Sequence, residues 1–468
     1  MTLSLEPGGG GLSLGLPVAG RASSAATAAL RQLEGRDVAL FRLDGGKHRG
    51  AIGTAEGEAI ERAVHLAVEV GVPIVGRIAS SGADVSDGVA SLHAWGCVAK
   101  ALSDASGVVP VVLLLVGPAV SGPALLLGIA DHVIMTEDAF AYVTGPDVVV
   151  AFTGVPIEGD RLGGATVHER QSGVATCVVA DEDDAMVALE GLLSYLPSNH
   201  LADPPREDTD DPVDRPAARA AAAVPTRATA SYDVRTVIGD VLDEHSFLEL
   251  RDRYAASMVT GLGRLDGRAV GVVANQPMQQ AGSLDIDAAQ KAARFVQWCD
   301  CFNLPVVTFV DTSGYLPGKD LEWRGIIRHG AQLLHAYAAA TVPRICVVLR
   351  KAYGGAYIVM DSAGLGVDYC IAWPTAEIAV MGAPPAVQIL HRRRLQAIDD
   401  PIERAQEQAK LVAEYEDRFL NPYIAAERGY VDIVIAADDT RRVLVDALER
   451  LGTKREQQPG RRHSNTPL

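Results

Sequence analysis

The sequence predicts an α/β fold that is built twice along the chain, and three observations lead to this prediction. Landmarks of the first half recur in the second half at a nearly constant offset. Short apolar runs alternate with stretches whose apolar residues follow helical spacing. A segment rich in proline and acidic residues, 200–231, separates two halves of similar size. Strands and helices repeated in two domains fit all three observations.

The repeat is visible as pairs of aligned stretches. They are "EGRDVALF" (34–41) with "DGRAVGVV" (266–273), "GVPIVGRIASSGA" (71–83) with "NLPVVTFVDTSGY" (303–315), residues 107–128 with 340–361, and "YVTGP" (142–146) with "VMGAP" (380–384). Landmark residues keep the register: Arg36 with Arg268, Gly50 with Gly282, Pro73 with Pro305 and Gly82 with Gly314 at an offset of 232, and Pro110 with Pro343 and Gly122 with Gly355 at 233. Chance rarely holds a register over so many landmarks, so we expect a duplicated fold.

Each half carries the same order of elements. Residues 55–71 and 285–303 have the apolar spacing of amphipathic helices. Each of these helices is followed by an apolar stretch typical of a buried strand, 73–79 in the first half and 305–311 in the second. Around these elements we expect a flexible N-terminus over 1–30, an N-terminal domain over 31–199, a linker over 200–231 and a C-terminal domain over 232–468.

The composition excludes several classes of partner. The chain has 468 residues and a net charge of -17, whereas nucleic acids and anionic membranes select basic surfaces. The start of the chain lacks the basic and apolar regions of a secretory signal. The longest apolar stretch, 108–120, is too short and too broken to span a bilayer. We therefore expect a soluble cytoplasmic protein that binds neither nucleic acid nor membrane.

The cysteines do not suggest a metal site. Only Cys299 and Cys301 are close in sequence, and a lone C-x-C is a poor zinc pattern. Reduced, buried thiols are the expected state of all six cysteines in the cytosol.

A small-residue turn stands at the same place in each half, between an apolar strand and a helix. It contains Ser121 and Gly122 in the first half and Gly355 and Ala356 in the second. Backbone N–H groups in the first turn of a helix have no acceptor within the helix, and the helix dipole adds positive charge there. Two such turns could hold two oxyanions, for example an enolate formed from a thioester. The alternative is a pair of tight turns without a ligand.

Several motifs together resemble a known family. They are "YVTGPDVV" (142–149), "FVDTSGYLPG" (309–318), "GIIRHGAQLLHAYAAATVP" (325–343), "KAYGGAYIVM" (351–360) and "AWPTAEIAVMGA" (372–383). The sequence resembles the carboxyltransferase β subunits of acyl-CoA carboxylases, of the actinobacterial acetyl- and propionyl-CoA type. The resemblance covers roughly residues 35–468 and is strongest from about 230 to 440.

The resemblance implies two crotonase-like domains of ββα repeats and transfer of a carboxyl group from carboxybiotin to the α-carbon of a short acyl-CoA. Acetyl-CoA would give malonyl-CoA, with propionyl-CoA to methylmalonyl-CoA as a second reaction. Fatty-acid and polyketide precursors both fit these products. Amides at Gly355 and Ala356 would hold the biotin ureido oxygen, and those at Ser121 and Gly122 the thioester oxygen. Biotin itself would act as the base, so no metal and no catalytic triad is expected.

The same resemblance gives further residues on the substrate side. They are Tyr353, Gly354, Ile358, Gly382 and Ala383. Ile358 would line the acyl pocket and resembles members that accept acetyl-CoA, although core packing explains it equally well. Tyr353 is more simply a packing residue.

The implied partners are a biotinylated α subunit, which combines biotin carboxylase and biotin carrier, and further copies of the chain in a homo-hexamer. The sequence contains no Ala-Met-Lys-Met type of biotin-attachment motif, so biotin would be supplied in trans.

The first half departs from the family pattern. In "ASSGADVSDG" (79–88), Ala79 stands where aspartate is frequent and Asp84 where arginine is usual. Pro123 follows Gly122 and has no N–H to donate. Two alternatives are therefore open: a non-catalytic structural paralogue in a mixed carboxylase, and a biotin-dependent decarboxylase subunit.

Overall fold

The structure is a computed structural model that describes residues 24–227 and 229–467. The chain divides into two compact units. Unit 1 contains the described residues up to Pro205, with Leu250–Tyr254 and Cys301–Asn303. Unit 2 contains Arg206–Glu249, Ala255–Asp300 and the described residues from Leu304 onward. Most of the N-terminal segment expected over 1–30 lies outside the described residues, and a strand begins at Ala26.

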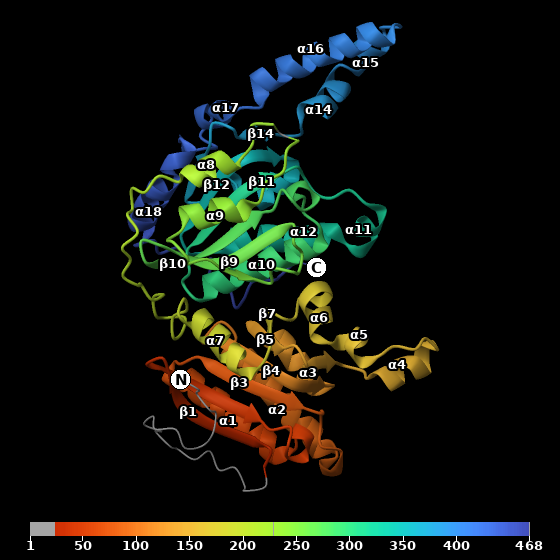
Figure 1. The fold of residues 1–468 in the computed structure, drawn as a ribbon, viewed down its shortest axis with the longest axis vertical. Helices are drawn as coiled ribbons and strands as arrows, with labels where there is room; N and C mark the ends of the chain where they lie inside the picture. The colour runs from red at the N-terminus through yellow and green to blue at the C-terminus, as the bar shows by residue number, and fades with distance from the viewer. Residues whose placement is uncertain (1–23, 228, 468) are drawn as a thin grey trace. The chain divides into compact units, whose positions relative to one another are not determined.

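Unit 1 is a mainly parallel sheet with helices (Figure 1). Its strands are β1 (Ala26–Leu33), β2 (Arg36–Leu43), β3 (Ile74–Ser80), β4 (Val111–Val120), β5 (His132–Thr136), β6 (Phe140–Tyr142) and β7 (Cys177–Val179). Its helices are α1 (Thr54–Val70), α2 (Val89–Ala105), α3 (Gly122–Ile129), α4 (Pro146–Thr153), α5 (Gly159–Gly163), α6 (Ala165–Val167) and α7 (Glu182–Leu193).

Unit 2 repeats this plan and adds helices to it (Figure 1). Its strands are β8 (Leu248–Leu250), β9 (Met258–Leu265), β10 (Arg268–Asn275), β11 (Val306–Thr312), β12 (Arg344–Tyr353), β13 (Tyr369–Ala372), β14 (Glu377–Ala379) and β15 (Ile433–Val434). Its helices are α8 (Ala218–Ala223), α9 (Val234–Val241), α10 (Ile286–Cys301), α11 (Lys319–Arg324), α12 (Ile326–Ala339), α13 (Gly354–Val359), α14 (Ala383–Leu390), α15 (Arg392–Gln396), α16 (Pro401–Phe419), α17 (Pro422–Glu427) and α18 (Thr440–Leu451).

The two sheets have the same topology, which confirms the predicted duplication. The strand order is β1-β2-β3-β4-β5-β7 in unit 1 and β8-β9-β10-β11-β12-β13-β15 in unit 2, where β8 is an additional edge strand. In each sheet a short strand, β6 or β14, pairs with the end of β4 or β12. Both sheets shift register at the same place, after Ile78 in β3 and after Val310 in β11. The left-handed turns also repeat, since Gly50 (φ 65°) matches Gly282 (φ 71°). The apolar strand stretches are almost fully buried in both units, as both-side coverage of a parallel sheet requires.

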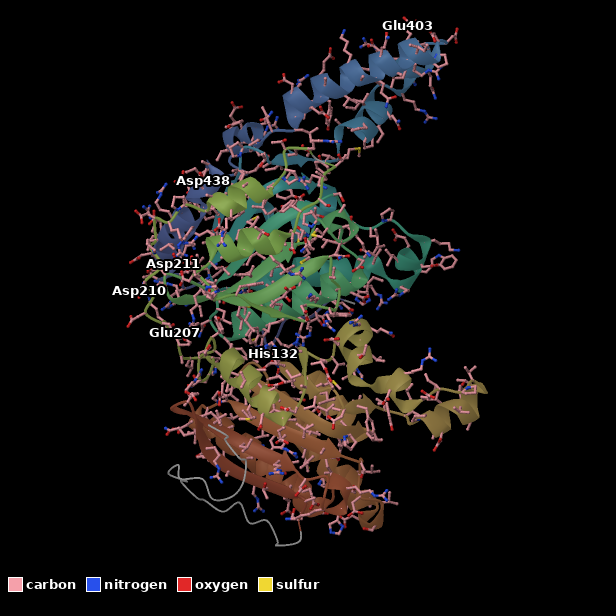
Figure 2. All side chains as sticks on the ribbon, viewed as in Figure 1. His132, Glu207, Asp210, Asp211, Glu403 and Asp438 are labelled. Atoms are coloured by element: carbon pink, nitrogen blue, oxygen red, sulfur yellow. The ribbon has the colours of Figure 1, made fainter. Side chains whose placement is uncertain are left out.

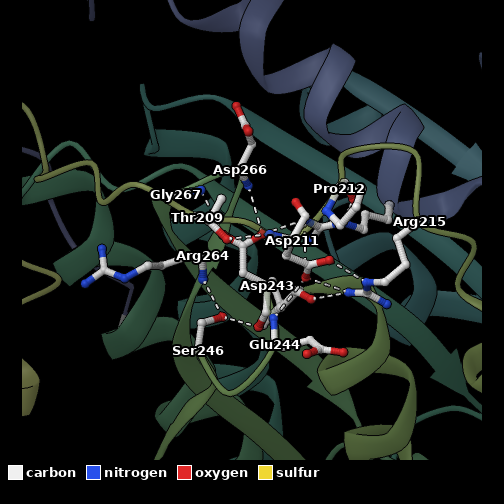
Figure 3. A network of polar contacts seen from close by, with 12 residues as sticks. Thr209, Asp211, Pro212, Arg215, Asp243, Glu244, Ser246, Arg264, Asp266 and Gly267 are labelled. Atoms are coloured by element: carbon white, nitrogen blue, oxygen red, sulfur yellow. Dashed lines mark hydrogen bonds and ion pairs between the residues drawn. The ribbon is translucent and has the colours of Figure 1, made fainter.

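Part of the segment expected to be a linker belongs to the body of unit 2. Ala220 in helix α8 and Ala217 directly before the helix pack into the hydrophobic core of that unit, where both are fully buried. Just before it, Asp211 accepts hydrogen bonds from Arg215 at 2.6 and 2.9 Å, and a buried arginine, Arg441, donates to Asp243 at 2.8 Å. Figure 3 shows the network around Asp211 and Asp243. Residues 206–227 are therefore held along unit 2, because their alanines and aspartates find buried partners there.

Helices α14, α15 and α16 form an arm on unit 2 (Figure 1). A small cluster of Val387, Leu395 and Leu411 holds the arm together. Helix α16 buries only Leu411 and carries charged side chains along its length, with Glu403 near one end (Figure 2).

Candidate functional site

The first candidate loop joins β4 to α3 in unit 1. Ser121 lies between these elements with φ 63°, and α3 begins at Gly122. The Ser121 amide donates to the carbonyl of Tyr142 at 3.0 Å, where it extends the pairing of β4 with β6. Of the two amides expected to be available in this loop, that of Ser121 is therefore already bonded. Pro123 comes next in the helix and has no N–H to donate. The Gly122 amide is therefore the donor in this loop that has no acceptor within the helix.

Gly122 is covered on its side-chain face by Trp95 from α2. A Cβ at residue 122 would lie 2.2 Å from Trp95 Nε1, so no larger residue fits there. The strand–turn–helix arrangement explains why the position needs a glycine: the loop passes directly against an aromatic ring.

The second candidate loop joins β12 to α13 in unit 2. Gly354 has φ 60°, in the region that favours glycine, and a Cβ there would lie 3.0 Å from the carbonyl oxygen of Val380. Gly355 and Ala356 follow in the first turn of α13, where amides have no acceptor within the helix. A Cβ at Gly355 would have only Tyr315 Cε2 as a neighbour, at 3.8 Å, so this face is open. The second loop offers two consecutive donors, where the first offers one.

The substrate-side residues lie around the second loop. Tyr353 donates a hydrogen bond from its hydroxyl to Glu377 in β14. Burial raises the pKa of Tyr353, and the carboxylate of Glu377 raises it further. A Cβ at Gly382 would lie 3.4 Å from the Tyr353 ring, and Ala383 begins α14 next to it. Ile358 lies in α13 with 42% of its surface exposed, so it is not a core residue of unit 2.

A buried ion pair lies behind the second loop. Arg350 Nε donates to Asp311 Oδ2 at 3.0 Å, and both side chains are fully buried. Arg350 also donates to the carbonyls of Arg227 and Ala230, at 2.9 and 2.8 Å. Burial raises the pKa of Asp311, and the guanidinium of Arg350 opposes that rise. Asp311 thus has a structural role as the counter-charge of a buried arginine.

In the part of the chain that the structure describes, the altered residues of unit 1 leave no unpaired charge in its interior. Ala79 matches Asp311, and Gly117 matches Arg350, so both members of the ion pair are replaced together. A Cβ at Gly117 would lie 3.2 Å from the Cβ of Ala79, which shows how closely the small residues pack. Asp84 accepts hydrogen bonds from the amide and hydroxyl of Ser86, which hold its pKa below the ordinary value. Asp84 therefore caps a turn.

Sequence reasoning missed Arg350, Glu377 and Trp95. The offset that revealed the repeat would have flagged Arg350, because it pairs this arginine with Gly117. No comparable signal marks Glu377 or Trp95, since both contacts depend on which elements pack together.

Two kinds of feature are absent from the described residues. No helix in the described ranges is both long enough and apolar enough to cross a membrane. Within the same ranges, no group of three or more histidine, cysteine, aspartate or glutamate side chains could hold a metal ion.

Known proteins resemble this chain over nearly all of its length. Residues 23–466 match the carboxyl transferase domain family. The propionyl-CoA carboxylase carboxyltransferase subunit of Haloferax mediterranei is 46% identical over 438 residues, 93% of this chain and 84% of that protein. The propionyl-CoA carboxylase beta chain of Saccharopolyspora erythraea is 46% identical over 449 residues, 93% of this chain and 82% of that protein.

A solved structure extends the similarity to the fold. The crystal structure of transcarboxylase 12S, described as a hexamer with methylmalonyl-coenzyme A and methylmalonic acid bound, matches with a TM-score of 0.92 at 40% identity. The match covers 95% of this chain and 85% of that chain. Both the family match and the two curated relatives span most of the sequence, and the chain has the duplicated crotonase-like fold. The chain therefore belongs to the carboxyl transferase domain family, as its motifs predicted.

Proposed function

We propose that this chain transfers a carboxyl group between biotin and the α-carbon of a short acyl-CoA, with propionyl-CoA as the preferred substrate. The observation that carries the proposal is the pair of strand–turn–helix loops, one per repeat, in which Gly122 and the Gly355–Ala356 pair lie in the first turn of a helix. The preference for propionyl-CoA rests on the two curated relatives that are 46% identical to this chain, both propionyl-CoA carboxylase subunits. Acetyl-CoA, the substrate expected first from the sequence, becomes the second candidate.

The two loops have different roles in this proposal. Removal of a proton from the acyl α-carbon places negative charge on the thioester oxygen, and the Gly122 amide would donate to that oxygen. Gly355 and Ala356 would donate to the ureido oxygen of biotin, where charge develops as the carboxyl group leaves. Biotin, held by a partner subunit, would supply the carboxyl group and accept the α-proton. The protein's part is to fix positions and to stabilise charge, which needs no metal-binding residues.

The proposed assembly rests on the similarity to a solved structure. The described transcarboxylase 12S is a hexamer, and we propose a homo-hexamer for this chain with a biotinylated subunit as partner.

The direct test runs the reaction backwards without a partner. The purified chain is mixed with methylmalonyl-CoA or malonyl-CoA and free biotin, and acyl-CoA products are separated by chromatography. We expect propionyl-CoA to form faster than acetyl-CoA, and only when biotin is present. Absence of both products, together with no carboxylation of any short acyl-CoA after reconstitution with a biotinylated α subunit, would overturn the proposal. Transfer that is faster with malonyl-CoA would restore acetyl-CoA as the main substrate.

Ile358 provides a prediction about acyl-chain choice. If its half-exposed side chain lines the acyl pocket, Ile358→Asp should change the ratio of propionyl-CoA to acetyl-CoA rates about tenfold, because one methylene in an apolar pocket is worth ~1–3 kcal/mol. Initial rates with both substrates measure the ratio. Ile402→Asp on α16, at a position 69% exposed, is the matched control and should leave the ratio unchanged. An unchanged ratio in both variants would remove Ile358 from the pocket.

A further inference from the structure

The surroundings of the second loop are polar, whereas the matching surroundings of the first loop are apolar. The matched positions are Asn275 with Leu43, Asp311 with Ala79, Arg350 with Gly117, Lys351 with Pro118, Tyr353 with Val120, and Glu377 with Phe140. Burying polar groups in a protein costs free energy unless they are paired. Because these polar residues occur in only one of the two repeats, we expect them to have a role that is specific to that repeat. The strand pairing is the same in both, so the polar set is not needed to form the sheet.

The polar side chains follow one path toward the loop, through close pairs and neighbours on paired strands. Lys351 Nζ lies 4.0 Å from Asp311 Oδ1, and Lys351 is also the cross-strand partner of Glu377. Burial lowers the pKa of Lys351, while the carboxylates of Asp311 and Glu377 favour its charged form. Glu377 in turn accepts the hydrogen bond from the Tyr353 hydroxyl. The path thus ends at the residue directly before Gly354.

Tyr353 joins the two segments that carry the proposed site. Its backbone caps α13, whose first residues include Gly355 and Ala356. Its ring packs against Gly382, the residue that caps α14. Because Glu377 holds the hydroxyl end of the ring, the side chain has both ends fixed.

We propose that Tyr353 and Glu377 are positioning residues that fix the direction of the Gly355 and Ala356 amides toward the ureido oxygen of biotin. This inference rests on the proposed function. Without the hydrogen bond, the Tyr353 ring is free to turn against Gly382, and the cap of α13 loses its lateral support. Donors misplaced by a fraction of an ångström lose much of their effect on a developing charge. The first loop needs no such device, since the Ser121 amide is already tied to Tyr142.

Three single variants and one double variant test the hydrogen bond. Tyr353→Phe removes the donor and Glu377→Ala removes the acceptor, and each should lower kcat of carboxyl transfer about tenfold to a hundredfold. KM for the acyl-CoA should change little, because the thioester is assigned to the other loop. Glu377→Gln keeps an acceptor oxygen and should retain most of the activity. The double variant Tyr353→Phe with Glu377→Ala should be no slower than the slower single variant, since both remove one contact.

Tyr337→Phe is the matched control. Tyr337 is buried in the same unit and its hydroxyl lies 2.9 Å from Thr308 Oγ1, so the variant also loses a buried tyrosine hydrogen bond. It should lower the melting temperature and leave kcat near that of the unaltered chain. Equal kcat for Tyr353→Phe and the unaltered chain would overturn the inference, as would equal losses in Tyr353→Phe and Tyr337→Phe. An unaltered chain without any carboxyl transfer would instead contradict the proposed function.

Discussion

Replacing Asp311 by asparagine should lower the free energy of unfolding of unit 2 by ~3–5 kcal/mol. Arg350 is only 1% exposed, and its one charged partner within hydrogen-bond distance in the described residues is Asp311. Asparagine can still accept a hydrogen bond, but it leaves the guanidinium charge buried without a counter-charge. Denaturation by urea, followed by circular dichroism, measures the change.

Two further variants make this result specific. Asp104→Asn removes an ion pair with Lys100 on the exposed face of α2, where more than half of each side chain is accessible, and should cost less than ~1 kcal/mol. Combining Asp311→Asn with Arg350→Met should recover part of the lost stability, because the buried charge disappears with its partner. If Asp311→Asn costs no more than Asp104→Asn, the buried pair does not stabilise the fold.

Replacing Ala356 by proline should slow carboxyl transfer about 100- to 1,000-fold, the usual effect of losing one oxyanion donor. Proline removes the amide hydrogen and is tolerated in the first turn of a helix. The chain itself carries Pro123 at the matching position of α3 in unit 1, so the repeated backbone accepts a proline ring at this position. Rates of transfer between methylmalonyl-CoA and biotin measure the effect, and a melting curve checks that the variant is folded.

Pro123→Ala is the reciprocal variant and adds an amide to the first loop. It should leave the rate unchanged or raise it, since it gives the thioester oxygen a second donor. A folded Ala356→Pro variant with an unaltered rate would show that the second loop does not hold a charged oxygen.

The duplicated fold could be predicted from the sequence because a repeat leaves its mark on every element. The spacing of Arg36 and Arg268, or of Gly50 and Gly282, requires no knowledge of packing, and the structure confirms it in the strand order and in the shared left-handed turns. The positions of Gly122 and Gly355 between a strand and a helix could also be predicted, because apolar strands, small turn residues and helical spacing are local signals in the sequence. Family membership followed from motifs around these turns and is confirmed by relatives over nearly the whole chain.

The partners of individual groups were decided by tertiary structure alone. The sequence presents Ser121 as an open amide, but pairing of β4 with β6 gives that amide to Tyr142. It presents residues 200–231 as a linker, but Ala217 and Ala220 are buried in unit 2. Hydrogen bonds and burial depend on which distant segments meet, and a single sequence does not record that. The sequence determined where the two loops lie along the chain, and the packing around each decided that the second offers two donors and the first only one.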